Sequence, residues 1–333
     1  MSRRIILVTG GAGFIGSNIV ADLAETGEYE VAVCDRLETA ELAKWKNLAK
    51  HALSDLVEPE GMFDWLARHQ NQVEAVVHMG AISSTTEPDV DLIVRTNFGL
   101  SRDLWNWCTD HRKRLIYASS AATYGDGALG FDDADDVQSL SRLRPLNAYG
   151  WSKALFDLYA RREADRGRAP VQWAGLKFFN VYGPNEHHKG SMRSVVHQIW
   201  PQAAEGKTVR LFKSHLEGYP DGGQLRDFVY VKDAAQVVDW LMENPDVNGV
   251  YNLGTGQARS FADLAAATFR AAGKAPAIEY FDMPEVLRAQ YQYFTEAAMA
   301  RLREAGYDKP FTSLEDGVAD YVKAYLSQPD PYR

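Results

Sequence analysis

A glycine-rich turn near the N-terminus constrains the fold more than any other stretch of the sequence. Residues 4–9 form an apolar run typical of a buried parallel strand, and they lead directly into the sequence GGAGFIG at residues 10–16. In this spacing Gly10 permits a tight turn, Gly13 lets the backbone approach a pyrophosphate, and Gly16 lets the next helix pack on the strand. That helix would present free N–H groups and its positive dipole end to the phosphates. The stretch therefore predicts a strand–turn–helix unit that binds a dinucleotide.

The segment that follows supports dinucleotide binding and raises the question of which nucleotide is bound. A second apolar run at residues 30–34 ends at Asp35, and an acid about 20 residues beyond the glycines usually bonds the ribose hydroxyls. Asp35 alone favours NAD, because a carboxylate repels a 2′-phosphate. Arg36 follows it and Lys44 lies close in sequence, and these cations could hold a 2′-phosphate. The residues themselves leave the choice between NAD and NADP open.

Further apolar runs predict the architecture. Strand-like runs at residues 53–56, 73–81 and 114–120 alternate with helical segments through about residue 178, which predicts an α/β fold with a doubly wound parallel (Rossmann) sheet. We expect residues 1–178 plus about 229–257 to form the dinucleotide-binding domain. Residues of about 179–228 plus 258–333 would form a second, smaller α/β domain for the substrate. The active site would lie in the cleft between the two domains.

Composition excludes several functional classes. The 333-residue chain can bury a substantial core, and its net charge of −9 argues against general nucleic-acid binding. Cys34 and Cys108 lack metal-ligand spacing and are expected to be reduced core residues, so we predict no metal site. The apolar run after Ser2 and Arg3 is too short for a signal peptide or a membrane span. We therefore expect a cytoplasmic protein that does not associate with membranes.

Three polar residues point to acid–base chemistry. Tyr149 and Lys153 are spaced four apart and would share one face of a helix. A lysine charge beside a phenol lowers the tyrosine pKa and provides a base near neutral pH; the alternative is an exposed tyrosine beside a solvated lysine. Ser120 comes at the carboxyl end of the fifth predicted strand, where doubly wound sheets bind ligands. It could donate a hydrogen bond to a substrate, or it could simply cap the strand.

The glycine turn, Asp35, Ser120 and the Tyr149/Lys153 pair together resemble the extended short-chain dehydrogenases/reductases, which act mainly on nucleotide sugars. The resemblance covers nearly the whole chain. Segments of the second half narrow it: FFNVYGP at 178–184, HKGSM at 188–192, RDFVYV at 226–231 and AGYDKPF at 305–311. They resemble the heptose 6-epimerases, a family that acts on ADP-glyceromanno-heptose for bacterial lipopolysaccharide synthesis.

The resemblance implies a role for a set of residues. Tyr149 and Lys189 would be the acid/base pair, with Ser120 beside them and Lys153 binding the nicotinamide ribose; otherwise Lys189 would be a phosphate-binding or surface lysine. The cofactor would contact Gly10, Gly13, Phe14, Ile15, Gly16, Asp35, Arg36, Lys44, Met79, Gly80, Ala81, Ser83, Asn97, Tyr149, Lys153, Val181 and Lys189. The substrate would contact Asn180, Ser191, His197, Phe212, Lys213, Ser214, His215, Arg226 and Tyr291. The family commonly has F-E-G-S at residues 212–215, so Lys213 and Ser214 change the chemistry of that loop.

The resemblance also implies the reaction: oxidation of the sugar at C6 to a ketone, and return of hydride to the opposite face. The cofactor would be NADP, with NAD less favoured, and it would stay tightly bound and be regenerated in each turnover. A homo-oligomer, in particular a pentamer, is implied by the resemblance alone. One alternative is a UDP-hexose 4-epimerase, which would use Tyr149 and Ser120 without needing Lys189. The other is a non-catalytic NADP-binding protein, against which the retained Tyr149/Lys153 pair argues.

Overall fold

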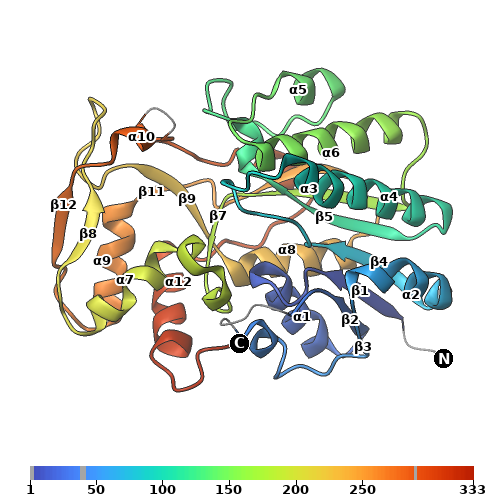
Figure 1. The fold of residues 1–333 in the computed structure, drawn as a ribbon, viewed down its shortest axis with the longest axis horizontal. Coiled ribbons are helices and arrows are strands. Elements are labelled where there is room, and N and C mark those ends of the chain that lie inside the picture. Colours follow the sequence, from blue (N-terminus) through green and yellow to red (C-terminus); the bar gives the residue numbers. More distant parts are fainter. Residues whose placement is uncertain (1–3, 38–42, 289–290) are drawn as a thin grey trace.

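The computed structural model describes residues 4–37, 43–288 and 291–333, so Ser2 and Arg3 lie outside it (Figure 1). Its largest sheet has seven strands in the order β10-β6-β5-β4-β1-β2-β3, and every neighbouring pair is parallel. The strands are β1 (Ile5–Thr9), β2 (Glu30–Cys34), β3 (Asp55–Val57), β4 (Val73–His78), β5 (Arg114–Ser120), β6 (Gln172–Phe178) and β10 (Gly249–Leu253). The predicted doubly wound α/β fold is confirmed.

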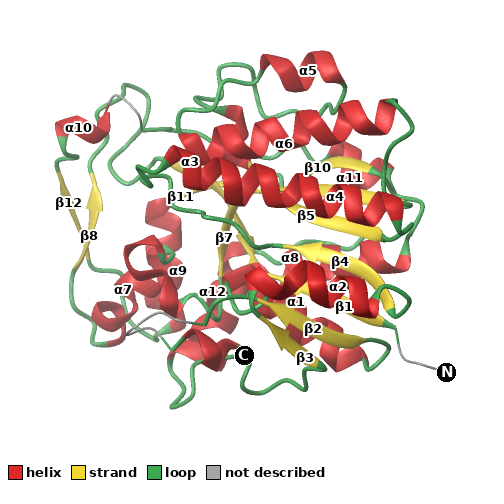
Figure 2. Cartoon of the chain, turned by 45° about the vertical axis from the view of Figure 1, so that its right-hand side comes forward, coloured by secondary structure: helices red, strands yellow, loops and turns green. Residues whose placement is uncertain are grey.

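Helices cover both faces of this sheet (Figure 2). Successive residues of a strand point to opposite faces, so in β1 Ile6 and Val8 pack into one core cluster while Ile5 and Leu7 pack into another. The first cluster receives α1 (Phe14–Thr26) and α8 (Val231–Glu243); the second receives α2 (Met62–His69), α4 (Leu100–Asp110) and α6 (Ala148–Asp165). Each fully buried large apolar side chain contributes about 1.5–3 kcal/mol. Apolar runs on central strands thus position both helical layers.

The remaining strands form two small sheets. In the three-stranded sheet, β9 (Leu225–Tyr230) lies between β7 (Asn180–Tyr182) and β11 (Ala258–Ser260). It is parallel to β7 and antiparallel to β11. In the two-stranded sheet, β8 (Val209–Phe212) pairs with β12 (Ile278–Phe281). The helices here are α7 (Val195–Ala204), α9 (Phe261–Ala271), α10 (Glu285–Arg288), α12 (Leu314–Asp320) and a π-helix at Tyr321–Leu326. Among the helices of the described ranges, none combines the length and the apolar composition needed to cross a bilayer.

The predicted domain division remains a prediction, but two features bear on its edges. The boundary at residues 228/229 falls inside β9. The segment around α11 (Ala300–Glu304) buries Leu302 and Tyr307 in the core cluster that α8 forms with the large sheet. This segment therefore packs on the dinucleotide-binding half, although the sequence pattern placed it in the smaller domain.

Cys34 and Cys108 are both free and buried, as predicted.

Candidate active site

A cavity of about 790 Å³ lies at the carboxyl ends of β1, β4, β5 and β6. Parallel sheets bind ligands at this edge, and here residues from β7, β9 and α9 complete the walls. Eighteen of the residues predicted from the sequence line it: Gly10, Gly13, Phe14, Ile15, Gly16, Asp35, Lys44, Met79, Gly80, Ala81, Ser83, Ser120, Tyr149, Lys153, Asn180, Val181, Lys189 and Arg226. The fold thus brings most of the predicted cofactor residues and the acid–base candidates to one cavity.

The glycine turn has the geometry of a phosphate cradle. Gly10 adopts a φ of 66°, and a Cβ there would lie 2.6 Å from the backbone nitrogen of Gly80. A Cβ on Gly16 would lie 2.2 Å from the carbonyl oxygen of Gly10. Only glycines permit this close packing, and it brings the N-terminus of α1, whose first N–H groups have no intrahelical partner, to the cavity wall. These features fit the pyrophosphate of a dinucleotide.

Beyond the cradle, Asp35 and Lys44 form a partly buried ion pair at the cavity wall. The Asp35 carboxylate accepts a hydrogen bond from the Ala12 N–H at 2.9 Å and lies 2.6 Å from the Lys44 ammonium. Arg36 points elsewhere: its side chain is 68% exposed and pairs with Glu60. Of the two cations considered for a 2′-phosphate, the structure places Lys44 at the cavity and Arg36 outside it.

Tyr149 and Lys153 lie one turn apart in α6, which begins at Ala148 because the Asn147 side chain accepts the Gly150 N–H at 2.8 Å. The buried Lys153 ammonium donates to the Ala118 carbonyl at 2.8 Å, and burial lowers its pKa to about 8. Burial raises the pKa of Tyr149, although a hydrogen bond with Ser120 opposes that rise. We expected Lys153 to lower the Tyr149 pKa; this expectation is wrong, because burial of the phenol has the largest effect and raises the pKa.

Ser120 caps a turn, which is one of the two roles expected from its position, and a substrate contact, the other role, stays a prediction. Its Oγ accepts the Ala122 N–H at 3.1 Å and so caps a 3₁₀ turn at Ala121–Tyr124. The same side chain hydrogen-bonds Tyr149 and lines the cavity. Capping therefore fixes the serine where it can also meet a ligand.

Lys189 reaches the cavity from the second half of the chain, on a 3₁₀ segment at His187–Met192. Its ammonium lies 4.8 Å from the centroid of the Phe14 ring, and burial lowers its pKa while the charge of Glu186 opposes the change. Glu186 is itself buried and accepts hydrogen bonds from the Ser194 backbone and hydroxyl at 2.5 Å and from the Tyr321 hydroxyl at 3.0 Å. This carboxylate anchors the segment that carries Lys189.

Nine predicted residues do not line the cavity: Arg36, Asn97, Ser191, His197, Phe212, Lys213, Ser214, His215 and Tyr291. Asn97 is fully buried, and its amide is occupied by the backbone N–H and carbonyl of Ile82 at 2.8 and 3.0 Å and by the Ser152 hydroxyl at 3.1 Å. It therefore anchors the loop that carries Ala81 and Ser83. Ser191 is exposed, and the His197 ring packs against His187 at 4.8 Å between centroids.

The loop at residues 212–215 lies beside the cavity residue Arg226. Tyr291 bridges the two: its ring centroid is 5.2 Å from the Arg226 guanidinium and 6.3 Å from the Phe212 ring centroid. His215 accepts the Met283 N–H at 3.2 Å, and Lys213 pairs with Asp282 at 3.5 Å. Phe212 and Tyr291 are thus near the site. The side chains of Lys213 and His215 instead contact the two residues that follow β12.

Several cavity residues were not predicted, among them His188, Arg193, Ser194, Gln292 and Thr295. His188 belongs to the motif at 188–192, and Arg193 and Ser194 are the two residues that follow it, so that motif could have indicated them. Gln292 follows the predicted Tyr291 and donates to the Gly125 carbonyl. Thr295 has no sequence signal; its buried hydroxyl has no hydrogen-bond partner among the described residues. Only the path of the chain reveals that it faces the cavity.

Comparison with known proteins gives consistent results. Residues 6–254 match the model of the NAD dependent epimerase/dehydratase family. The chain is 52% identical over 328 residues to the ADP-L-glycero-D-manno-heptose-6-epimerase of Nitratidesulfovibrio vulgaris, covering 98% of this chain and 99% of that protein.

Two solved structures are similar along almost their whole length. The Helicobacter pylori ADP-L-glycero-D-manno-heptose-6-epimerase superimposes with a TM-score of 0.77 at 28% identity, covering 98% of this chain and 97% of the other. The Thermus thermophilus UDP-glucose 4-epimerase, solved in complex with NAD, gives 0.71 at 27% identity and covers 95% and 96% of the two chains.

Proposed function

The chain belongs to the NAD dependent epimerase/dehydratase family and, within it, to the ADP-L-glycero-D-manno-heptose-6-epimerases. We therefore propose that it interconverts ADP-D-glycero- and ADP-L-glycero-β-D-manno-heptose at C6. One observation carries the proposal for the site: Tyr149 and Lys189, from separate halves of the chain, line the same cavity as the glycine cradle. A C6 epimerase needs proton-transfer groups for both orientations of its hydroxyl.

The cofactor residues divide by the part of the dinucleotide they would hold. The turn from Gly10 to Gly16 would bind the pyrophosphate, Asp35 and Lys44 the adenosine ribose, and Lys153 the nicotinamide ribose. When bound, a nicotinamide dinucleotide supplies reversible hydride transfer. The protein would contribute the glycine cradle and the Lys153 cation that orients the nicotinamide ribose.

Tyr149 and Lys189 would accept and donate the proton of the C6 hydroxyl. Oxidation of a secondary alcohol to a ketone requires a base on the oxygen, and reduction of the ketone requires an acid. Rotation about the C5–C6 bond turns the ketone over, so the oxygen leaves one residue and approaches the other. Burial raises the pKa of Tyr149 and lowers that of Lys189, which favours a protonated phenol and eases formation of a neutral amine. Opposite shifts of this kind separate acid from base.

Arg226 would bind the substrate's diphosphate. It is nearly buried at the cavity wall, where its guanidinium lies 5.7 Å from the Phe261 ring centroid and 5.2 Å from that of Tyr291. One of its nitrogens donates to the Leu225 carbonyl at 2.8 Å. A guanidinium held this way keeps further N–H groups for bidentate hydrogen bonds to phosphate oxygens.

NADP is the proposed cofactor. Lys44 offsets the negative charge of Asp35 at 2.6 Å, and this weakens the carboxylate's repulsion of a 2′-phosphate. Mass spectrometry of the cofactor released from purified protein should show mainly NADP, and Lys44→Met should raise the Kd for NADP more than that for NAD. Detection of NAD alone would overturn this proposal. Homo-oligomerisation and a cytoplasmic location remain predictions.

The test of the function is a comparison of two substrates. Purified protein loaded with cofactor is incubated with ADP-D-glycero-β-D-manno-heptose and, separately, with UDP-glucose, and the products are identified by NMR. We expect the C6 epimer from the first and no UDP-galactose from the second. Formation of UDP-galactose with no turnover of the heptose would instead indicate the 4-epimerase alternative.

A further inference from the structure

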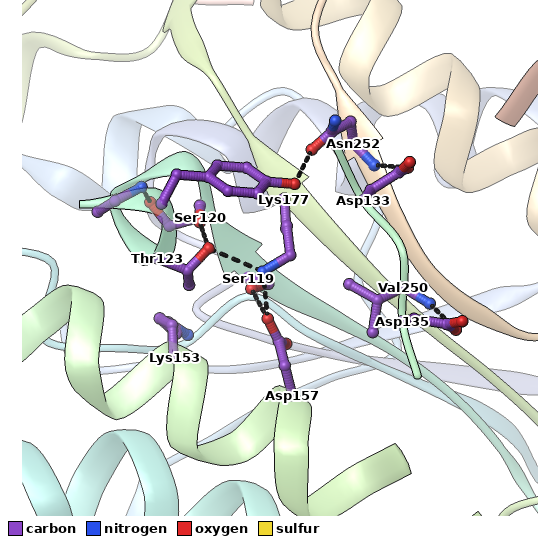
Figure 3. A network of polar contacts seen from close by, with 12 residues as sticks. Ser119, Ser120, Thr123, Asp133, Asp135, Lys153, Asp157, Lys177, Val250 and Asn252 are labelled. Atoms are coloured by element: carbon purple, nitrogen blue, oxygen red, sulfur yellow. Dashed lines mark hydrogen bonds and ion pairs between the residues drawn. The ribbon is translucent and has the colours of Figure 1, made fainter. Parts of the chain in front are cut away.

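A buried ion pair between Asp157 and Lys177 lies next to the turn that carries Ser120 (Figure 3). Asp157 on α6 is 0% exposed and Lys177 on β6 is 1% exposed, and the ammonium and carboxylate are 2.7 Å apart. Two charges taken out of water are costly, and well-packed apolar residues often stabilise a protein as well or better. Stability alone therefore does not explain why this ion pair is buried here.

Hydrogen bonds connect the pair to Ser120 from two sides. The Asp157 carboxylate accepts the Ser119 hydroxyl at 2.7 Å. The Lys177 ammonium donates to the Thr123 hydroxyl at 2.7 Å, and that hydroxyl donates to the Ser120 carbonyl at 2.8 Å. Both the residue before Ser120 and its own backbone are thus held by one buried charge pair.

Helix geometry connects the same pair to Lys153. Asp157 follows Lys153 by four residues in α6, so the two side chains share a face of the helix. Its negative charge opposes the effect of burial on Lys153 and raises the pKa of that ammonium. Lys177 from β6 and the Tyr117 hydroxyl from β5, at 3.1 Å, also face the carboxylate. Tyr124 and Tyr149 lie within its field, which raises the pKa of each.

We propose that Asp157 is a positioning residue of this active site: it fixes the turn bearing Ser120 through Ser119 and Lys177, and it places a negative charge one helical turn from Lys153. The role of the cavity itself rests on the function proposed above. Asp157 would touch neither substrate nor cofactor, and it would act only through residues that do.

A charge-balanced variant tests this inference. Asp157→Asn combined with Lys177→Met removes both buried charges at nearly constant volume, so no charge is left unpaired. The matched control is Asp165→Asn, the same substitution on the same helix at an exposed residue that pairs with Arg161. Dissociation constants for NADPH and NADH, measured by fluorescence across pH, report on Lys153 without requiring turnover. Turnover of ADP-heptose is measured in parallel.

Loss of the Lys153 proton should weaken cofactor binding at alkaline pH, and it should occur at lower pH without Asp157. The rise in Kd between about pH 6.5 and about pH 8.5 should be roughly fivefold larger in the double variant than in the wild type or the Asp165→Asn control. A wild-type pH profile in the folded double variant would overturn the inference, since Asp157 would then merely neutralise Lys177. Wild-type protein inactive on ADP-heptose would overturn the proposed function instead and leave the binding comparison valid.

Two milder variants test the positioning role of Asp157 if the double variant does not fold. Ser119→Ala and Thr123→Val each remove one neutral hydroxyl from the network and leave both charges in place. We expect turnover to fall about tenfold in each through displacement of Ser120, with the melting temperature little changed. Wild-type turnover in both variants would overturn the inference.

Discussion

Replacing Tyr149 by phenylalanine separates catalysis from stability. The substitution removes one hydroxyl from a partly buried side chain and leaves the ring in the cavity wall. The structure gives that hydroxyl a hydrogen bond with Ser120, whose Oγ keeps its bond from the Ala122 N–H. Loss of a single hydrogen bond of this kind costs about 1 kcal/mol of stability. In a chain of this length that corresponds to a decrease of about 3 °C or less in Tm.

The expected effect on turnover is far larger. General acid–base groups contribute about 10²–10⁴-fold, which corresponds to about 3–5 kcal/mol of transition-state free energy. The variant should therefore bind cofactor, melt near the wild-type temperature and epimerise at 1% of the wild-type rate or less, as a rough upper limit.

Tyr159→Phe is the matched control. Tyr159 lies on the same helix, and its hydroxyl bonds the Asn106 side chain at 3.1 Å near the surface, away from the cavity. That variant should lose a comparable hydrogen bond and keep wild-type turnover. Near-normal turnover in Tyr149→Phe would refute the assignment of Tyr149 as an acid/base group, whatever the control shows.

Two further predictions concern a second catalytic candidate and a buried carboxyl group. Lys189→Met should lower kcat by orders of magnitude with cofactor binding retained; a rise in KM alone, with kcat unchanged, would make Lys189 a binding residue. Asp239→Asn should raise Tm more at about pH 8 than at about pH 5. Burial raises the pKa of Asp239 to about 7 from 3.8, so the wild type loses stability as pH rises through that range. An equal gain at both pH values would contradict this assignment.

The sequence predicted those parts of the site whose signals are local. The spacing of Gly10, Gly13 and Gly16 after an apolar strand fixes a strand–turn–helix unit, and the four-residue spacing of Tyr149 and Lys153 fixes a shared helix face. Because parallel strands end at a common edge, Ser120 could also be placed correctly. The structure brings these residues to one cavity.

Other features depend on packing between distant segments and have no local signal. Thr295 lines the cavity only because the chain crosses back after β12. Asn97 is buried against Ile82, although the family resemblance implied a cofactor contact. The direction of the Tyr149 pKa shift could not be predicted either, since it depends on how deeply the phenol is buried. Arg36 and Lys44 were both candidates for a 2′-phosphate by sequence, and the structure places only Lys44 at the cavity.

The fate of the hydrogen on C6 distinguishes direct oxidation at C6 from removal of a proton next to a carbonyl. Direct oxidation and reduction move this hydrogen as hydride, and a hydride held on carbon does not exchange with water during one turnover. Removal of a proton next to a carbonyl would instead place it on a side-chain oxygen or nitrogen, where solvent replaces it. In a single turnover of ADP-heptose deuterated at C6, we predict that the epimerised product retains the label, and that unlabelled substrate in heavy water gains no deuterium at C5 or C6. Solvent deuterium at either carbon would contradict direct oxidation at C6, even if the product were the expected heptose epimer.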